Sequence, residues 1–172
     1  EISISHNEVG LYNMGLSDYG LPIYVCIVNG AKDSINTFKK AEIDFALCAP
    51  TGRAAKRLEQ TSEHEATTIH RLLDYSPKGS FNRSSKSPLP QSVIICDEAS
   101  MIDVELMHNL LDALDVGTSV IFVGDVDQLP PVGPGQPFRD LIKSGAVNVH
   151  YLRQNFRQGV KSGIALAATQ VN

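Results

Sequence analysis

The stretch SVIICDEAS, residues 92–100, decides how this sequence is interpreted. Residues 92–96 form a short apolar run, and such runs are typical of strands buried on both faces of a sheet. Asp97 and Glu98 follow directly. Two carboxylates at a strand tip suit nucleotide hydrolysis on Mg2+, where one holds the metal's water shell and the other orients or deprotonates the attacking water. Asp97 is therefore the candidate metal ligand and Glu98 the candidate general base, whereas an acidic helix cap would explain only one of the two.

Runs of the same kind recur along the chain, and segments with helical spacing lie between them. The predicted strands are residues 22–28, 43–49, 92–96, 118–123 and 146–152, and the predicted helices are residues 51–59, 67–75, 103–114 and 137–143. Asp103 is expected to cap the third helix and Gly117 to stop it. This alternation predicts an α/β fold with a mainly parallel sheet flanked by helices. Ligands of such sheets bind at the carboxyl ends of the strands, so Pro50, Asp97 and Gly124 should share one edge.

Length and composition fit one compact domain. The chain has 172 residues and a net charge of -4, which argues against a wholly basic nucleic-acid coat protein but leaves room for a local basic groove. Residues 1–20 are expected to form a lead-in of unknown role, and residues 21–172 the domain itself. Cys26, Cys48 and Cys96 are each set in an apolar run, which predicts buried, reduced thiols. Without a membrane-length apolar stretch or a leader, a cytoplasmic location and no membrane partner are expected.

Two further strand ends carry polar segments. The sequence GDVDQLPPVGPG, residues 124–135, has the glycine and proline density of a rigid loop, and its Gln128 could sense a terminal phosphate. The sequence PTGRAAKR, residues 50–57, combines a glycine with the start of a helix, where backbone amides bind phosphate. Its basic residues, taken alone, are more typical of a solvated helix face. Residues 76–92 are rich in Ser and Pro and contain Lys78, Arg83 and Lys86 but no acidic residue, and a solvated loop is the simplest interpretation.

Five segments in order resemble the RecD-like branch of superfamily-one DNA helicases, the group that includes the exodeoxyribonuclease V alpha subunit. They are APTGRAAKRL (49–58), TIHRLL (68–73), DEASMID (97–103), GDVDQLPPVGPG (124–135) and NFRQ (155–158). Each is moderately specific, and five in register are highly specific. The resemblance implies the first RecA-like domain, of the P-loop NTPase fold, of an ATP-dependent motor that moves 5′ to 3′ on single-stranded DNA. It also implies partner subunits of a recombination or repair complex.

The resemblance also implies roles for individual residues. Asp97 and Glu98 would serve Mg2+ and water activation, Gln128 would couple the γ-phosphate of ATP to the DNA contacts, and Arg157 would reach the γ-phosphate. The single-stranded DNA surface would comprise Pro50, Thr51, Gly52, Arg53, His70 and Arg71. A lone His beside apolar neighbours is often structural, so His70 depends on the family context.

The family pattern breaks before residue 43. The chain contains no Gly-x-x-x-x-Gly-Lys-[Ser/Thr] motif, the loop that cradles nucleotide phosphates. Gly30 and Lys32 are the remaining candidates for nucleotide contacts, but Asp33 beside Lys32 would repel a triphosphate. The chain also ends before the second motor domain, which in this family supplies an arginine finger and half of the DNA track. The isolated chain is therefore expected to be inactive as an ATPase.

Two functions follow from these observations. The first is a helicase motor segment whose P-loop is damaged, deleted or missing from this sequence. The second is a non-hydrolysing module that retains the fold and the DNA surface as a binding or scaffold unit. The intact acidic and Gln128 motifs indicate that the chain descends from a helicase motor. The missing P-loop indicates that its present activity is that of the non-hydrolysing module. A P-loop enzyme of another kind is disfavoured, because residues 68–73 and 155–158 would then match by coincidence.

Overall fold

The fold is built on one sheet of six parallel strands in the computed structural model, which describes residues 23–27, 35 and 38–151. The strand order is β3-β2-β4-β5-β1-β6. The strands are β1 (Ile23–Ile27), β2 (Phe45–Ala49), β3 (Ala66–Thr68), β4 (Val93–Cys96), β5 (Ser119–Gly124) and β6 (Asn148–Tyr151). Every pairing between neighbours is parallel, as the alternation of apolar runs and helical segments predicts.

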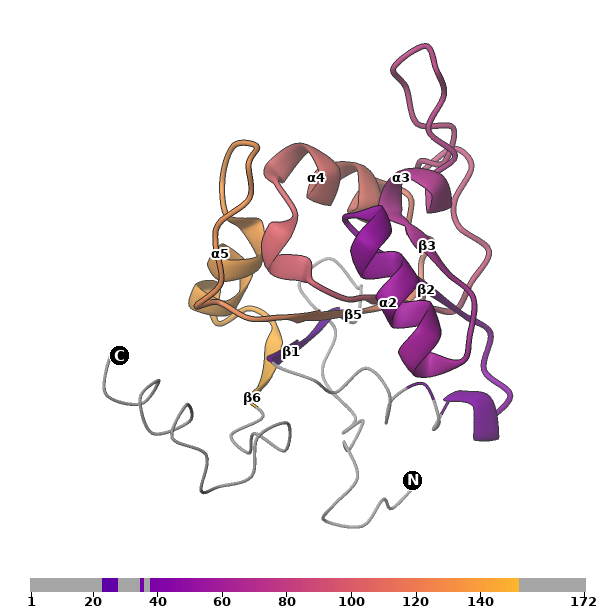
Figure 1. The fold of residues 1–172 in the computed structure, drawn as a ribbon. Helices are drawn as coiled ribbons and strands as arrows, with labels where there is room; N and C mark the ends of the chain where they lie inside the picture. Colours follow the sequence, from indigo (N-terminus) through magenta and orange to yellow (C-terminus); the bar gives the residue numbers. More distant parts are fainter. Residues whose placement is uncertain (1–22, 28–34, 36–37, 152–172) are drawn as a thin grey trace.

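Helices connect the strands and cover the sheet (Figure 1). They are α2 (Gly52–Ser62), α3 (Ile69–Leu72), α4 (Val104–Asp112) and α5 (Pro137–Ser144), with a 3-10 turn η1 (Ala99–Met101). Asp103 caps α4 as expected, because its Oδ1 accepts a hydrogen bond from the backbone N–H of Leu106 at 2.9 Å. Among the described residues, none of the helices is long and apolar enough to cross a membrane.

The core lies on both faces of the sheet because alternate residues of each central strand point to opposite sides. On β4, Ile94 and Cys96 pack into a cluster with residues of α3, α4 and α5, whereas Val93 and Ile95 pack into a second cluster that includes Leu58 of α2. All four β4 residues are buried. The central strands therefore have no solvent-facing side, which explains why their sequences are unbroken apolar runs.

The structure corrects several expected boundaries. The segment 67–75 is not one helix, because residues 66–68 form β3 and α3 spans only Ile69–Leu72. Helix α4 ends at Asp112, so Gly117 does not stop it; that glycine has a φ of 93° in the turn before β5. Strand β6 is not buried on both faces, because it is an edge strand with exposed ends. Residues 1–20 lie outside the described residues.

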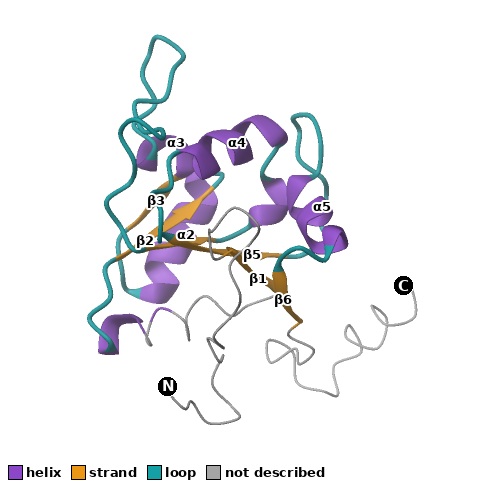
Figure 2. Ribbon diagram, turned by 180° about the vertical axis from the view of Figure 1, so that it is seen from behind, coloured by secondary structure: helices purple, strands orange, loops and turns teal. Residues whose placement is uncertain are grey.

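The loop that joins α3 to β4 projects beyond the body of the domain (Figure 2). It contains two isolated antiparallel bridges, between Tyr75 and Phe81 and between Ser84 and Ser87. The ring centroids of Tyr75 and Phe81 lie 4.9 Å apart, and the ring of His70 contacts both. A small aromatic cluster thus fixes the base of the loop to α3.

Candidate functional site

The carboxyl ends of the strands bring the predicted site segments to one edge, as expected for a parallel sheet. The register pairs Cys48 with Cys96 and Cys96 with Phe122, so β2, β4 and β5 end side by side. Pro50, Asp97 and Gly124 are placed at or just past these ends. The backbone N–H of Asp97 also donates to the carbonyl of Cys48 at 2.9 Å, which continues the β2–β4 pairing into the site.

Glu98 occupies an unusual backbone conformation at the tip of β4. Its φ of 53° and ψ of 39° lie in the left-handed region, which residues with a Cβ seldom adopt. The residue turns the chain sharply from the strand into η1. Such strain of about 1–3 kcal/mol is characteristic of functional sites, where the surrounding structure holds it in place.

An ion pair joins Glu98 to α2. One Oε of Glu98 lies 3.6 Å from a guanidinium nitrogen of Arg57, whose side chain is 55% exposed. An exposed pair of this kind contributes about 0–1 kcal/mol to stability. The pair is therefore of interest because it places Arg57 beside Glu98, and not because it stabilises the fold. In the sequence, Arg57 is one of several positive charges on a predicted helix face. Nothing in its neighbouring residues indicates that its partner is Glu98, at the end of a different strand.

The segment around Pro50 forms the start of α2. Thr51 caps this helix, since its side-chain oxygen accepts a hydrogen bond from the backbone N–H of Ala54 at 3.2 Å. Thr68 caps α3 in the same way. Strand pairing sets Thr68 opposite Ala49, so the two caps are neighbours at the edge of the sheet.

The predicted DNA-contact side chains outside these caps are solvent-facing. Arg53, His70 and Arg71 are exposed, as are Lys78 and Lys86 of the projecting loop. Arg83 is half-buried instead, and its guanidinium donates to the carbonyl of Pro88 at 3.2 Å. Arg83 therefore stabilises the loop itself and is less accessible than Lys78 and Lys86.

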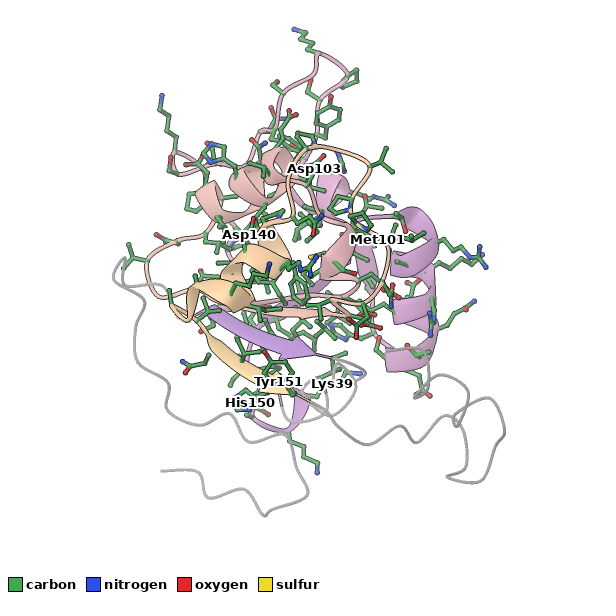
Figure 3. All side chains as sticks on the ribbon, turned by 90° about the vertical axis from the view of Figure 1, so that its left-hand side faces the viewer. Lys39, Met101, Asp103, Asp140, His150 and Tyr151 are labelled. Atoms are coloured by element: carbon green, nitrogen blue, oxygen red, sulfur yellow. The ribbon has the colours of Figure 1, made fainter. Side chains whose placement is uncertain are left out.

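The loop after β5 is anchored to the start of α4. A Cβ at Gly133 would collide with the carboxylate of Asp103, and the backbone N–H of Val104 donates to the carbonyl of Pro134 at 3.0 Å. Figure 3 shows Asp103 beside this loop. These two contacts hold the loop against the start of α4, and Gln128 is exposed near the beginning of the loop.

The two described thiols near the site are buried and reduced. Cys48 and Cys96 are both fully buried and free. The neighbouring Cys48 and burial together raise the pKa of Cys96 well above its usual value of 9.0. The side chain of Cys26 lies outside the described residues, as do Gly30, Lys32 and Arg157.

The donor chemistry fits a magnesium ion. Asp97 and Glu98 offer carboxylate oxygens, which Mg2+ prefers. Within the part of the chain that the structure describes, no group of three or more His, Cys, Asp or Glu side chains gathers into a metal cluster.

Comparisons with known proteins agree with this architecture. A family model described as an AAA domain matches residues 25–134. The chain is 41% identical over 152 residues to the ATP-dependent RecD2 DNA helicase of Deinococcus radiodurans, covering 84% of this chain and 21% of the relative. It is 37% identical over 135 residues to the RecBCD enzyme subunit RecD of Mycobacterium tuberculosis, covering 67% of this chain and 24% of the relative.

A solved structure shows the same fold. The Pif1 helicase from Bacteroides, in complex with ADP-AlF3 and ssDNA, superposes with a TM-score of 0.58 at 20% identity, over 88% of this chain and 42% of that one. The chain spans only about a fifth to a quarter of the two curated relatives, 21% and 24%. The family model, in contrast, covers more than half of this chain. The chain therefore belongs to the AAA domain family, and over most of its length it is similar to RecD-type DNA helicases.

Proposed function

We propose that this chain is the part of a RecD-like helicase that meets nucleotide and DNA, in a protein that couples ATP hydrolysis to 5′ to 3′ movement on single-stranded DNA. The observation that carries the proposal is the shared sheet edge, where Asp97, Glu98, the Gln128 loop and the start of α2 come together. Ligands of parallel α/β folds bind at that edge. The relatives, an ATP-dependent DNA helicase and a subunit of the RecBCD enzyme, support the same activity and partner subunits in a recombination complex.

The chemical roles follow from the position of each group. Asp97 would hold Mg2+, which neutralises charge on the phosphates during transfer. Glu98 would accept a proton from the attacking water or orient it. A guanidinium nitrogen of Arg57 lies 3.6 Å from a carboxylate oxygen of Glu98, so the proposed base lies beside the helix that begins next to Pro50. Gln128, exposed on its anchored loop, would sense the terminal phosphate.

The proposed DNA surface is the pair of helix starts at the sheet edge. Pro50, Thr51, Gly52 and Arg53 lie at the start of α2, and His70 and Arg71 lie on α3. The pairing of Ala49 with Thr68 supports treating them as one surface. The Pif1 helicase of the same fold was solved with ssDNA bound, which supports the ligand class.

A labelled single-stranded oligonucleotide, titrated at low salt, tests the DNA surface. Arg53→Ala should weaken binding to all sequences about equally, because backbone contacts position a strand without reading its bases. Each lost phosphate contact should reduce the slope of log affinity against log salt by about 0.7. Lys143→Ala is the matched control, because Lys143 is an exposed cation on α5. Equal binding by the Arg53→Ala and parent chains would refute the assignment.

The missing P-loop motif favours a second candidate, a non-hydrolysing module that retains the DNA surface. The two functions differ in the ATPase activity of this chain, which we expect to be very low. Phosphate release is measured with and without single-stranded DNA, with Glu98→Gln as the control for the proposed base. DNA-stimulated turnover that Glu98→Gln abolishes would show that another segment cradles the phosphates and would favour the enzyme. DNA binding without turnover would favour the module.

A further inference from the structure

Three aromatic side chains gather where the projecting loop leaves α3. The ring centroid of Tyr75 lies 4.9 Å from that of Phe81 and 5.4 Å from that of His70. The ring centroids of His70 and Phe81 are 5.6 Å apart, so each ring contacts the other two. His70 belongs to the proposed DNA surface, whereas neither the sequence motifs nor the proposed chemistry uses Tyr75 or Phe81.

Backbone hydrogen bonds hold this aromatic cluster in place. Tyr75 and Phe81 pair in an isolated antiparallel bridge, so their side chains share one face of a short hairpin. The backbone N–H of Tyr75 donates to the carbonyl of His70 at 2.9 Å. That of Arg83 donates to the carbonyl of Leu73, directly after α3, at 3.1 Å. The cluster is therefore ordered without a ligand, which lowers the entropy lost when a ligand binds.

Much of Tyr75 remains open to solvent. The residue is 47% exposed although two rings contact it, and His70 is exposed as well. An open aromatic face can stack with a planar ligand, but a single exposed ring is also common on protein surfaces. The charge around the cluster therefore decides which partner it suits.

The segment around the cluster is basic in an acidic chain. Residues 68–92 contain four Lys and Arg side chains and one Asp, whereas the whole chain has a net charge of -4. The single carboxylate, that of Asp74, accepts a hydrogen bond from Asn82 Nδ2 at 3.0 Å. Arg71 and Lys78 are exposed. Cations interleaved with aromatic rings are typical of surfaces that bind single-stranded nucleic acid, where the cations contact phosphates and the rings stack with bases.

We propose that the ring of Tyr75 is a platform that stacks with a base of single-stranded DNA, next to the contacts of Arg71. This inference rests on the proposed DNA surface and extends that surface from α3 into the loop. Stacking is tolerant of sequence, because every base has a π face. Phe81 and His70 then act as positioning residues, because their rings contact that of Tyr75.

Oligonucleotides with and without bases test the platform. A labelled oligothymidylate and an oligonucleotide of the same length built from abasic sites carry the same phosphates, so only contacts with bases distinguish them. At low salt, Tyr75→Ala should weaken binding of the first about 5-fold to 100-fold and leave binding of the second unchanged. Tyr75→Phe, which retains the ring, should bind the first like the parent chain. Equal losses on both oligonucleotides, or no loss on either, would overturn the platform.

Tyr151→Ala is the matched control. Tyr151 is 57% exposed and lies on β6, at the opposite edge of the sheet from β3, so its removal should leave binding of both oligonucleotides unchanged. The slope of log affinity against log salt separates the platform from the proposed phosphate contacts. Stacking neutralises no phosphate, so Tyr75→Ala should leave this slope unchanged, whereas Arg53→Ala should reduce it. A reduced slope in Tyr75→Ala would overturn the stacking role.

Fluorescence reports on the platform directly. The chain contains no tryptophan, so Tyr75→Trp introduces a single indole, and this variant keeps a large ring in the cluster. Stacking should quench the indole emission when the oligothymidylate is added but not when the abasic oligonucleotide is added. Emission that stays unchanged while the oligothymidylate binds would overturn the platform and leave the proposed DNA surface standing. A parent chain that binds neither oligonucleotide would refute the DNA surface, and the platform with it.

Discussion

Gly133→Ala should destabilise the protein more than its position in a half-buried part of a surface loop suggests. The new methyl group would occupy the place of the Asp103 carboxylate, so that side chain must move. Asp103 then loses the 2.9 Å hydrogen bond by which it caps α4. Loss of the cap costs about 1 kcal/mol, and the forced shift of the loop costs about 1–3 kcal/mol more. We expect a loss of about 2–4 kcal/mol in the free energy of unfolding.

Thermal and urea denaturation measure this loss, and a fall of about 5–10 °C in Tm is expected for a chain of this size. Gly52→Ala is the matched control, because a Cβ there meets nothing within 4 Å, and it should leave stability unchanged or slightly raised. In an Asp103→Ala background, Gly133→Ala should be much less destabilising, because the clashing carboxylate is gone. An equal loss in both backgrounds would refute the clash.

Three further predictions concern the same edge of the sheet. Arg57→Ala should change the free energy of unfolding by less than about 1 kcal/mol in a denaturant titration, because its pair with Glu98 is exposed; a larger loss would contradict the surface geometry. Gly124→Ala should lower the Tm by several degrees, because its Cβ would lie 3.0 Å from the ring of Phe138; an unchanged Tm would show that the ring yields. The raised pKa of Cys96 favours its neutral thiol in the folded state. The stability that this thiol contributes should be fully present below its usual pKa of 9.0, and it should be lost as pH rises through the higher pKa of the folded state. Native thiols should also react with iodoacetamide far more slowly than unfolded ones at pH 8, and equal rates would count against the burial.

The sequence by itself determined the positions of the central strands and the sheet edge at which Asp97 lies. Central strands such as β4 are buried on both faces, so each of them appears in the sequence as an unbroken apolar run. The place of Asp97 follows from this, because parallel strands present their carboxyl ends together. The sequence also predicted that Asp103 caps α4, because a cap depends only on the capping residue and the first turn of the helix that follows it. The missing phosphate loop is likewise a property of the sequence alone.

Local patterns misplaced the features that depend on weak or short signals. Strand β3 has three half-buried residues, two of them threonines, and therefore has no apolar run that would indicate a strand. The helical spacing around Ile69 instead led to the prediction of a helix over these residues. The sequence predicts that Gly117 stops the helix after Asp103, because glycine commonly follows the last helical residue. In the structure this helix, α4, ends earlier, at Asp112. In both cases the sheet and its packing outweighed the local preference of the chain.

Only the tertiary structure decided which distant groups meet. The pair between Arg57 and Glu98 and the contact of Gly133 with Asp103 each join two segments whose sequences give no indication of one another. A sequence pattern records whether a residue faces the core, because burial repeats along its own strand or helix. Partners across the sheet edge depend on strand order, turn geometry and packing, which are set by the whole chain at once.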